Sequence, residues 1–473
     1  MSYLPFPKEP KEVAKVNTAH RTICTKIPAE ESLPMFHDME KYETYSNSGL
    51  PLVIWHHTED GYKVCDAWGN KWIDFSSSIL INNCGHGLQE MVDAMDKVIH
   101  KPMLSAYLFC TEERIEAAKE LISVCPIPDA KVFMLSSGSE ATDAALKMMR
   151  TWGKKIGGPE KKIVITFQDS FHGRTLGAQQ LGGIPELKDW IGNVDPDMYQ
   201  TPYPNAFQHP FADPESPEYD EDKQWQTFLD TLEKYNVDPD KICGVCMGGY
   251  HEPLCQPAPK NFVQRLRKFC DEHNALLTID EVQSGACRSG TFWAFEQTGI
   301  IPDLFTAAKG MSGAMPQSAL FGRREIMDVY APGDLTSTHS GSPVASVATA
   351  ANIRYLRDNK VWEMAAERGK IVMDFMKDLQ KKFPHRIGMV SGQGLLFGVG
   401  YFDADKKPQP EFCRAVLMRS IEKGVLFTTP VFGGCVSRIV PPCNIPIDAL
   451  MEGLQVYAEA VAECDAEMPA YNA

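Results

Sequence analysis

The sequence predicts an α/β fold whose main sheet is largely parallel. From about residue 86 onward, short apolar or β-branched runs alternate with stretches of helical periodicity. Strands that alternate with helices form βαβ units, whose strands lie parallel in one sheet. The chain has 473 residues, 44% of them hydrophobic and 23% charged, which is ordinary globular composition and sufficient for a sizeable core.

The N-terminal part, residues 1–85, is expected to provide an arm and part of a small domain. Its first residues, about 40 of them, carry Pro, Lys and Glu without periodicity, which predicts an extended arm that becomes ordered on a partner surface. Residues 52–75 then alternate apolar and polar residues around two turn signals, Asp-Gly at 60–61 and Gly-Asn at 69–70. That pattern predicts a short antiparallel meander.

A large domain is expected over residues 86–343. Residues 201–222 are rich in Pro and acidic residues, which favours a surface excursion within it. Residues 344–473, with helical stretches followed by glycine-punctuated strands, are expected to form a separate α+β piece that completes the small domain. The strands of the large domain are predicted at residues 131–135, 163–167, 275–279 and 304–308.

Charge and cysteine content narrow the function classes. The 47 Lys and Arg against 62 Asp and Glu give a net charge of −15, which argues against a general nucleic-acid binder. The 14 Cys are scattered, and the N-terminus lacks the apolar core of a secretion signal, which favours a reducing cytoplasm. Since no run approaches about 18 uninterrupted apolar residues, no membrane span is expected.

The first motif with chemical content is the run of small residues at 136–141. It follows an apolar strand-like run and opens a helical pattern, so its backbone N–H groups and the positive helix end would form a site for an anion such as a phosphate. The alternative is an ordinary helix cap, in which Ser137 or Ser139 satisfies the first turn.

The second motif is Phe171, His172 and Arg174, on a loop that directly follows a predicted strand. In an open α/β sheet such loops form the ligand crevice. The aromatic ring is suited to stack on a flat heterocycle, and Arg174 to hold a carboxylate or sulfonate through two hydrogen bonds. The alternative is a packed Phe and a surface Arg.

Two further strands end in chemistry-bearing residues. One ends in Asp280 and Glu281, acids that suit a metal, a helix cap or a protonated nitrogen. The other is followed by Lys309, whose ammonium is costly to bury, so that its pKa would fall toward that of an amine that forms imines. A solvated Lys at a strand end is the alternative.

Together these parts match what pyridoxal phosphate requires: an amine for its Schiff base, an acid beside its pyridinium nitrogen and N–H groups for its phosphate. We expect no metal site. Cys243 and Cys246 have a ligand-like spacing, but they lie in an apolar run without a second pair, which favours buried thiols. The 12 His show no metal-ligand spacing, and Mg²⁺ at Asp280 and Glu281 would leave Lys309 and Gly138 unexplained.

Over roughly residues 50–460, the order and spacing of these motifs resemble the class III aminotransferases, the fold-type-I pyridoxal phosphate family that includes 4-aminobutyrate, ornithine and acetylornithine aminotransferases. The resemblance implies that Lys309 forms the Schiff base and shuttles protons, while Asp280 pairs with the pyridine nitrogen. The cofactor-binding residues it implies are Gly138, Ser139, Phe171, His172, Asp280, Val282, Gln283, Lys309 and Thr338.

The same resemblance suggests an acidic ω-amino substrate. Arg438 resembles the arginine that binds the α-carboxylate of an amino or 2-oxo acid, and Arg174 the one that 4-aminobutyrate enzymes use for the distal carboxylate. Glu252 matches the glutamate that pairs with the C-terminal arginine when an ω-amino substrate is bound. Ile79 matches a residue lining the substrate entrance.

The implied activity is a ping-pong transamination from an ω-amino acid, such as 4-aminobutyrate, taurine or β-alanine, to 2-oxoglutarate or pyruvate. A racemase or epimerase with the same cofactor is the competing function, and the presence of both Arg174 and Arg438 favours transamination between two acids. Thr338 matches the threonine that reaches the phosphate of the neighbouring subunit, which implies a homodimer with shared sites and leaves open whether dimers pair into tetramers.

Overall fold

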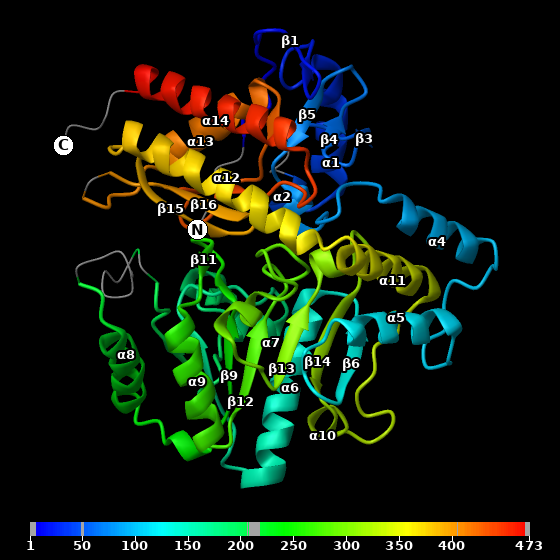
Figure 1. Ribbon diagram of the computed structural model, residues 1–473, viewed down its shortest axis with the longest axis vertical. Coiled ribbons are helices and arrows are strands. Elements are labelled where there is room, and N and C mark those ends of the chain that lie inside the picture. The colour runs from blue at the N-terminus through cyan, green and yellow to red at the C-terminus, as the bar shows by residue number, and fades with distance from the viewer. Residues whose placement is uncertain (1–5, 49–51, 206, 208–217, 404, 469–473) are drawn as a thin grey trace. The chain divides into compact units, whose positions relative to one another are not determined.

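The computed structural model describes residues 6–48, 52–205, 207, 218–403 and 405–468 (Figure 1). The chain divides into two compact units. One unit consists of Met1–Leu88 together with Met364–Ala473, and the other is the continuous stretch Gln89–Glu363. Within the described residues, no helix combines the length and apolar character needed to cross a membrane.

The continuous unit is built on a seven-stranded sheet in the order β6-β14-β13-β12-β9-β7-β8 (Figure 1). Only β14 runs antiparallel to its neighbours, β13 and β6, so the predicted α/β fold with a mainly parallel sheet is confirmed. The strands are β6 (Ala130–Leu135), β7 (Ile163–Phe167), β8 (Met198–Thr201), β9 (Ile242–Gly248), β12 (Leu276–Asp280), β13 (Leu304–Ala307) and β14 (Ser318–Arg323).

The four strands predicted in this unit are all present, because strands covered on both faces are apolar without interruption. Every residue of β7, β9 and β12 is buried. The central helix, α6 (Gly138–Gly157), packs on this sheet through the buried residues Ala141, Ala145 and Met149. Most of the surface excursion predicted at 201–222 lies outside the described residues.

Among the described residues, the continuous unit contains seven further α-helices that lie wholly within it. They are α4 (Gln89–Ile99), α5 (Glu112–Ser123), α7 (Leu176–Leu181), α8 (Glu221–Lys234), α9 (Lys260–Glu272), α10 (Arg324–Met327) and α11 (Pro343–Asp358). Short strands β10 (Tyr250–His251) and β11 (Gln256–Pro257) form a hairpin after β9. Helix α12 (Val361–Lys382) begins in this unit and continues into the next.

The discontinuous unit contains the predicted meander of β3 (His57–Glu59), β4 (Lys63–Cys65) and β5 (Lys71–Asp74). Asp60 and Gly61, in the loop of residues 60–62 that joins β3 to β4, have φ of 53° and 76°, a left-handed conformation that Gly and Asp adopt more readily than most residues. The sheet also includes β1 (Val16–Asn17), β2 (Thr22–Ile23) and β17 (Val425–Leu426), and the last of these pairs in parallel with β5.

The expectation of an extended N-terminal arm is wrong for the described residues. Residues Leu33–Tyr42 form helix α1, and Thr22 of β2 pairs with Lys71 of β5. Phe6, Ile23 and Ile27 are buried in the core of their own unit, so this segment packs against its own chain. The pattern was missed because strands of two residues leave no readable periodicity.

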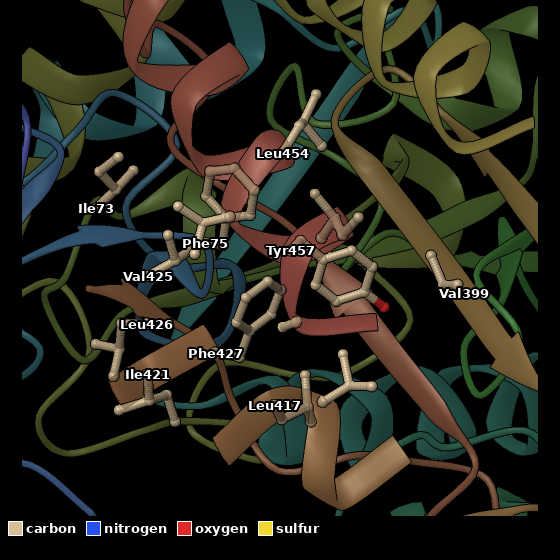
Figure 2. Close-up of a cluster of buried hydrophobic side chains, with 14 of the residues drawn as sticks. Ile73, Phe75, Val399, Leu417, Ile421, Val425, Leu426, Phe427, Leu454 and Tyr457 are labelled. Atoms are coloured by element: carbon tan, nitrogen blue, oxygen red, sulfur yellow. The ribbon is translucent and has the colours of Figure 1, made fainter. Parts of the chain in front are cut away.

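The core of this unit joins side chains from both ends of the chain. Figure 2 shows Phe75 near Phe427 and Tyr457, and the ring centroids of Phe75 and Phe427 are 5.6 Å apart. Trp72 Nε1 donates a hydrogen bond to the carbonyl of Ile421 at 2.9 Å. The remaining elements are α2 (Tyr45–Ser48), α3 (Ser77–Leu80), β15 (Ile387–Gln393), β16 (Leu396–Tyr401), α13 (Pro410–Glu422), β18 (Val436–Ile439) and α14 (Ile447–Glu467).

Candidate active site

The candidate site lies where five strands of the seven-stranded sheet end. Strands β6, β7, β9, β12 and β13 run in the same direction, so the segments that follow them leave at one edge of the sheet. In open α/β sheets this edge forms the ligand crevice. The residues at or after the ends of the five strands are, in that order, Gly138 and Ser139, Phe171 to Arg174, Glu252, Asp280, and Lys309.

Asp280 is the last residue of β12, and its carboxylate is buried. Its Oδ2 accepts a hydrogen bond from Nδ1 of His172 at 2.7 Å. Its Oδ1 accepts from the backbone N–H of Val282 and from the hydroxyl of Thr306, each at 3.0 Å. Three donors from three different segments therefore hold the carboxylate in one orientation.

His172 is buried between this carboxylate and α6. Its carbonyl accepts a hydrogen bond from the Thr142 hydroxyl at 2.7 Å, while its Nε2 is buried without a hydrogen-bond partner among the described residues. Burial opposes protonation of the ring, but the hydrogen bond and charge of Asp280 outweigh it and raise the pKa of His172. The protonated form of the imidazole is thus favoured by its contact with Asp280.

Lys309 follows β13 in a short turn of Lys309–Met311. Its φ is 48°, a left-handed conformation that is uncommon outside glycine and that is often found at functional positions. Asp280 is paired with Thr306 in the β12–β13 ladder, so Lys309 leaves the sheet three residues beyond the position opposite Asp280. This pairing of β12 with β13 could not be read from the order of the motifs in the sequence.

Gly138 begins α6, and a capping box formed by Ser137 and Glu140 satisfies the first turn of the helix. The helix cap that was the alternative to an anion site is therefore present. The backbone N–H of Ser139 does not take part in this capping box. A Cβ on Gly138 would lie 2.9 Å from Cγ1 of Val282, so only glycine lets the turn after β12 approach the helix so closely.

The loop after β7 rests on the same helix end. Ser139 Oγ accepts a hydrogen bond from the backbone N–H of Arg174 at 3.2 Å, and a Cβ on Gly173 would lie only 2.3 Å from that oxygen. The guanidinium of Arg174 lies 5.5 Å from the ring centroid of Phe171. Arg174 is exposed, and none of the described acidic groups lies within ion-pair distance of it. The cation is thus available to an anionic ligand.

Glu252, after the β9–β10 segment, is buried, and its Oε2 accepts from the backbone N–H of Phe171 at 3.5 Å. Burial raises the pKa of Glu252 to about 7, with His172 lowering it and Asp280 raising it. A Cβ on Gly248 would lie 2.2 Å from Oε1 of Glu252, so the strand end is shaped to accommodate this carboxyl group.

Glu281 has a structural role that the sequence did not show. Its oxygens accept hydrogen bonds from the backbone N–H groups of Ala294 and Phe295, at 3.0 and 2.9 Å, and from the Ser284 hydroxyl at 2.8 Å. Burial raises its pKa to about 7. These bonds hold Glu281 away from a shared site with Asp280, which leaves the adjacent acids with separate tasks.

The remaining expected cofactor residues lie around these groups. Val282 and Gln283 are partly buried in the turn after β12. Thr338 lines a cavity of about 410 Å³ beside the first turns of α6, together with Ser136 and Glu140. The structure therefore places every expected cofactor residue in the continuous unit.

Arg438 and Ile79 belong to the discontinuous unit. Arg438 lies on β18, and its Nε is buried without a hydrogen-bond partner among the described residues. Ile79 is exposed in a turn in which residues 77–80 all have positive φ. The chain just after Arg438 is tied to that turn, because the carbonyl of Val440 accepts from the Ser77 hydroxyl at 2.6 Å.

The donor set of the continuous unit fits pyridoxal phosphate. The buried Asp280 carboxylate suits a protonated ring nitrogen, and the glycine-lined approach of Val282 to the start of α6 leaves backbone N–H groups for a phosphate. Lys309 supplies an amine after β13 and Phe171 an aromatic face after β7, two strands that flank the β12–β9 pair in the sheet. All fourteen cysteines are free thiols, and Cys243 and Cys246 are buried in β9.

Comparison with known proteins agrees with this donor set. The model of the family described as aminotransferase class-III matches residues 44–461. An acetylornithine aminotransferase of Methanopyrus kandleri is 30% identical over 89% of this chain and 97% of its own, and a probable 4-aminobutyrate aminotransferase of Bacillus subtilis is 31% identical over 87% and 93%.

An alanine/serine racemase of Pyrococcus horikoshii is 27% identical, over 98% of this chain and 97% of its own. Among solved structures, a transaminase from the marine bacterium Virgibacillus superposes with a TM-score of 0.81 at 22% identity, covering 92% of this chain and all of that one. The architecture is thus shared with transaminases, while the relatives differ in what their names say they act on.

Proposed function

The chain belongs to the class-III aminotransferases, and from that premise we propose that it moves an amino group from an ω-amino acid to a 2-oxo acid by a ping-pong reaction. It is a pyridoxal phosphate-dependent aminotransferase with the type I fold. The amino donor that we propose is 4-aminobutyrate or a similar compound such as taurine or β-alanine. The proposed amino acceptor is 2-oxoglutarate or pyruvate.

When bound, pyridoxal phosphate supplies an electron sink for the negative charge that develops at the substrate carbon. Asp280 would hold its ring nitrogen, Gly138 and Ser139 its phosphate, and Lys309 its aldehyde carbon. Val282 and Phe171 would cover the ring faces, with Gln283 near the phenolic oxygen and Thr338 near a phosphate. These roles rest on the family's motifs and on the strand-end positions of the residues.

The chain's own groups then handle binding and proton movement. The Lys309 amine would take the proton from the substrate carbon that bears the amino group. Delivery of that proton to a different carbon gives transamination, whereas its return to the same carbon gives racemisation. His172 holds the Asp280 carboxylate in position through the 2.7 Å hydrogen bond. Burial of Asp280 and His172 keeps water away from this pair.

The observation that carries the choice of an acidic ω-amino donor is Arg174. Its guanidinium lies 5.5 Å from the Phe171 ring centroid, at the edge of the strand-end site, and is not engaged by a described acidic side chain. A planar guanidinium there suits a carboxylate or sulfonate carried by the far end of the substrate. We further propose that Arg438, with its unpartnered buried Nε, binds the α-carboxylate of the 2-oxo acid, and that Ile79 lines the substrate entrance.

A racemase is the second candidate, favoured by the Pyrococcus horikoshii relative that aligns with 98% of this chain. A racemase returns the proton to the carbon from which it came and needs one amino acid only. Two separate cations, Arg174 and Arg438, favour the reaction that must accept two acids in turn.

We also propose a homodimer in which Thr338 serves the phosphate site of the neighbouring subunit. The support is an exposed apolar segment: the side chains of Leu104, Leu108 and Phe109 are 60%, 59% and 79% exposed. A patch of this kind is stabilised when a second chain covers it.

Fourteen free cysteines support a reducing compartment, and we propose the cytoplasm.

A half-reaction tests the proposed activity. Holoenzyme is mixed with 4-aminobutyrate, taurine, β-alanine, ornithine or a neutral α-amino acid, and the loss of the cofactor's visible absorbance is followed without any oxo acid. Rapid loss with an ω-amino acid, reversed by 2-oxoglutarate or pyruvate, is the expected result. Exchange of the α-hydrogen of an α-amino acid with no net loss of absorbance would instead establish the racemase.

A further inference from the structure

The β3–β4 hairpin gathers three metal-ligating side chains on one face. His57 and Cys65 lie directly opposite each other in the antiparallel ladder, and Glu59 follows two residues after His57. Paired residues, and residues two apart on one strand, point to the same face of a sheet. The imidazole, carboxylate and thiol therefore share one surface of the discontinuous unit.

Their donor atoms are already close. One nitrogen of His57, a carboxylate oxygen of Glu59 and Sγ of Cys65 all lie within 4.8 Å of one another, and His57 Nε2 is 3.2 Å from Glu59 Oε1. Ligands of a tetrahedral zinc ion, at bond lengths of about 2.0 to 2.3 Å, are separated by about 3.3 to 3.7 Å. Small side-chain rotations are enough to bring three ligands to one ion.

The cluster is open on one side and closed on the other. Cys65 is buried at its base, whereas the side chain of His57 is 49% exposed and that of Glu59 is 32% exposed. An ion thus has access from solvent and finds a sulfur ligand at the end of its path. Nitrogen, oxygen and sulfur donors together suit Zn²⁺ and similar thiophilic ions, not Mg²⁺ or Ca²⁺.

A cation already occupies the edge of this cluster. Lys71 on β5 is the ladder partner of Cys65, and its Nζ contacts both carboxylate oxygens of Glu59, at 2.9 and 2.7 Å. The Lys71 side chain is 38% exposed, so its ammonium is free to move into solvent when another cation takes its place. The position is therefore one that accommodates positive charge.

We propose that His57, Glu59 and Cys65 bind one thiophilic divalent cation of the Zn²⁺ class, with water as the fourth ligand and Lys71 as the competing cation. Binding replaces the thiol proton of Cys65, which is released to solvent. All four side chains lie on three adjacent strands, outside the strand-end residues assigned to the cofactor. This site is independent of the proposed transamination.

Equilibrium dialysis of the holoenzyme against Zn²⁺, followed by metal analysis, tests the proposal. Cys65→Ala and His57→Ala are each expected to lose one equivalent of tightly bound Zn²⁺ relative to the unaltered chain. Cys24→Ala, which removes an exposed thiol of the same unit, is the matched control and is expected to lose none. Equal Zn²⁺ content in the unaltered chain and in His57→Ala, a half-exposed position whose loss spares the core, would overturn the proposal.

Substitution of Lys71 gives a second test, in which Zn²⁺ binding is expected to become tighter instead of weaker. Lys71→Met removes the competing ammonium and is expected to tighten Zn²⁺ binding by about fivefold, the fold-change that an exposed ion pair is worth. Lys71→Arg retains the competitor and is expected to bind as the unaltered chain does. Unchanged or weaker binding in Lys71→Met would refute the competition at Glu59.

Discussion

Nδ1 of His172 and Oδ2 of Asp280 are 2.7 Å apart, although 108 residues separate them in the sequence. His172 follows β7 and Asp280 ends β12, two strands that flank β9 in the sheet. The pair is buried, so the hydrogen bond is not weakened by exchange with water. This contact fixes the orientation of the carboxylate on which the proposed chemistry depends.

Replacing Asp280 with Asn is expected to lower kcat by about 100-fold or more, the scale of losing one preorganised electrostatic contact. Asn keeps the shape and can still bond Val282 and Thr306, but it cannot carry the negative charge. Steady-state kinetics of transamination measure the loss. Thr306→Val, which removes only one hydrogen bond to Asp280, is the matched control. A loss of kcat in Thr306→Val as large as that in Asp280→Asn would contradict the charge argument.

Lys309→Ala is expected to abolish turnover, because no other group would supply the amine at the end of β13. Borohydride reduction of the holoenzyme followed by peptide mass analysis is expected to place the cofactor on Lys309. Lys188→Ala, a substitution in the segment after α7, is expected to retain both activity and labelling. Full activity in Lys309→Ala would refute the assignment.

Arg174→Ala is expected to raise KM for ω-amino acids by about 10- to 100-fold, the value of a hydrogen-bonded charge pair. A neutral amine or neutral α-amino acid lacks the distal anion, so its KM is expected to stay within a few-fold. Arg174→Lys is expected to recover only part of the loss, because an ammonium cannot form two parallel hydrogen bonds. An equal rise in KM for charged and neutral donors would argue against contact with the anion.

The free energy of unfolding is expected to decrease as the pH rises, because of the buried carboxyl group of Glu252. Burial raises the pKa of its carboxyl group from 4.5 to about 7, so the folded chain retains a proton that the unfolded chain releases. This contribution to the free energy of unfolding, at most about 3 kcal/mol, is fully present below pH 4.5 and is lost as the pH rises through about 7.

Chemical unfolding of the unaltered chain and of Glu252→Gln, at pH 5 and pH 8, measures this dependence. Gln cannot ionise, so the variant is expected to lose less stability than the unaltered chain between these two values. Glu186→Gln, on an exposed turn, is expected to behave as the unaltered chain does. Identical pH dependence in Glu252→Gln would show that this carboxyl group does not titrate in that range.

Gly138→Ala is expected to weaken cofactor binding by displacing Val282, whose Cγ1 would lie 2.9 Å from the new Cβ. In a Val282→Ala background that methyl group is gone, so the added effect of Gly138→Ala is expected to shrink. A double-mutant cycle of cofactor dissociation constants measures the coupling between the two positions. Additive effects would mean that the close approach of the two segments does not matter for binding.

The sequence predicted the strands of the continuous unit and the motifs at their ends, because fully buried strands are continuous apolar runs. It did not predict register. That Thr306 and His172 both reach Asp280 depends on which strands are neighbours, and this is decided by packing between segments far apart in the chain.

The N-terminal segment illustrates the same limit. Val16–Asn17 and Thr22–Ile23 are too short to show alternation, and their pairing depends on β5, about 50 residues later. The cluster of His57, Glu59 and Cys65 was missed for a similar reason. His57 and Cys65 lie on different strands and become neighbours only when the turn at Asp60 and Gly61 brings the two strands together.

The parallel pairing of β17 with β5 has a consequence for synthesis. Val425 and Leu426 are the partners of Ile73 and Asp74, so β5 cannot pair with β17 until the intervening chain, including the whole continuous unit, has been synthesised. At about 5 to 20 residues per second, that delay is on the order of tens of seconds. During it, Trp72 and Phe75 have no native partners from the C-terminal stretch, and the nascent chain is expected to be a substrate for chaperones that hold exposed apolar strands.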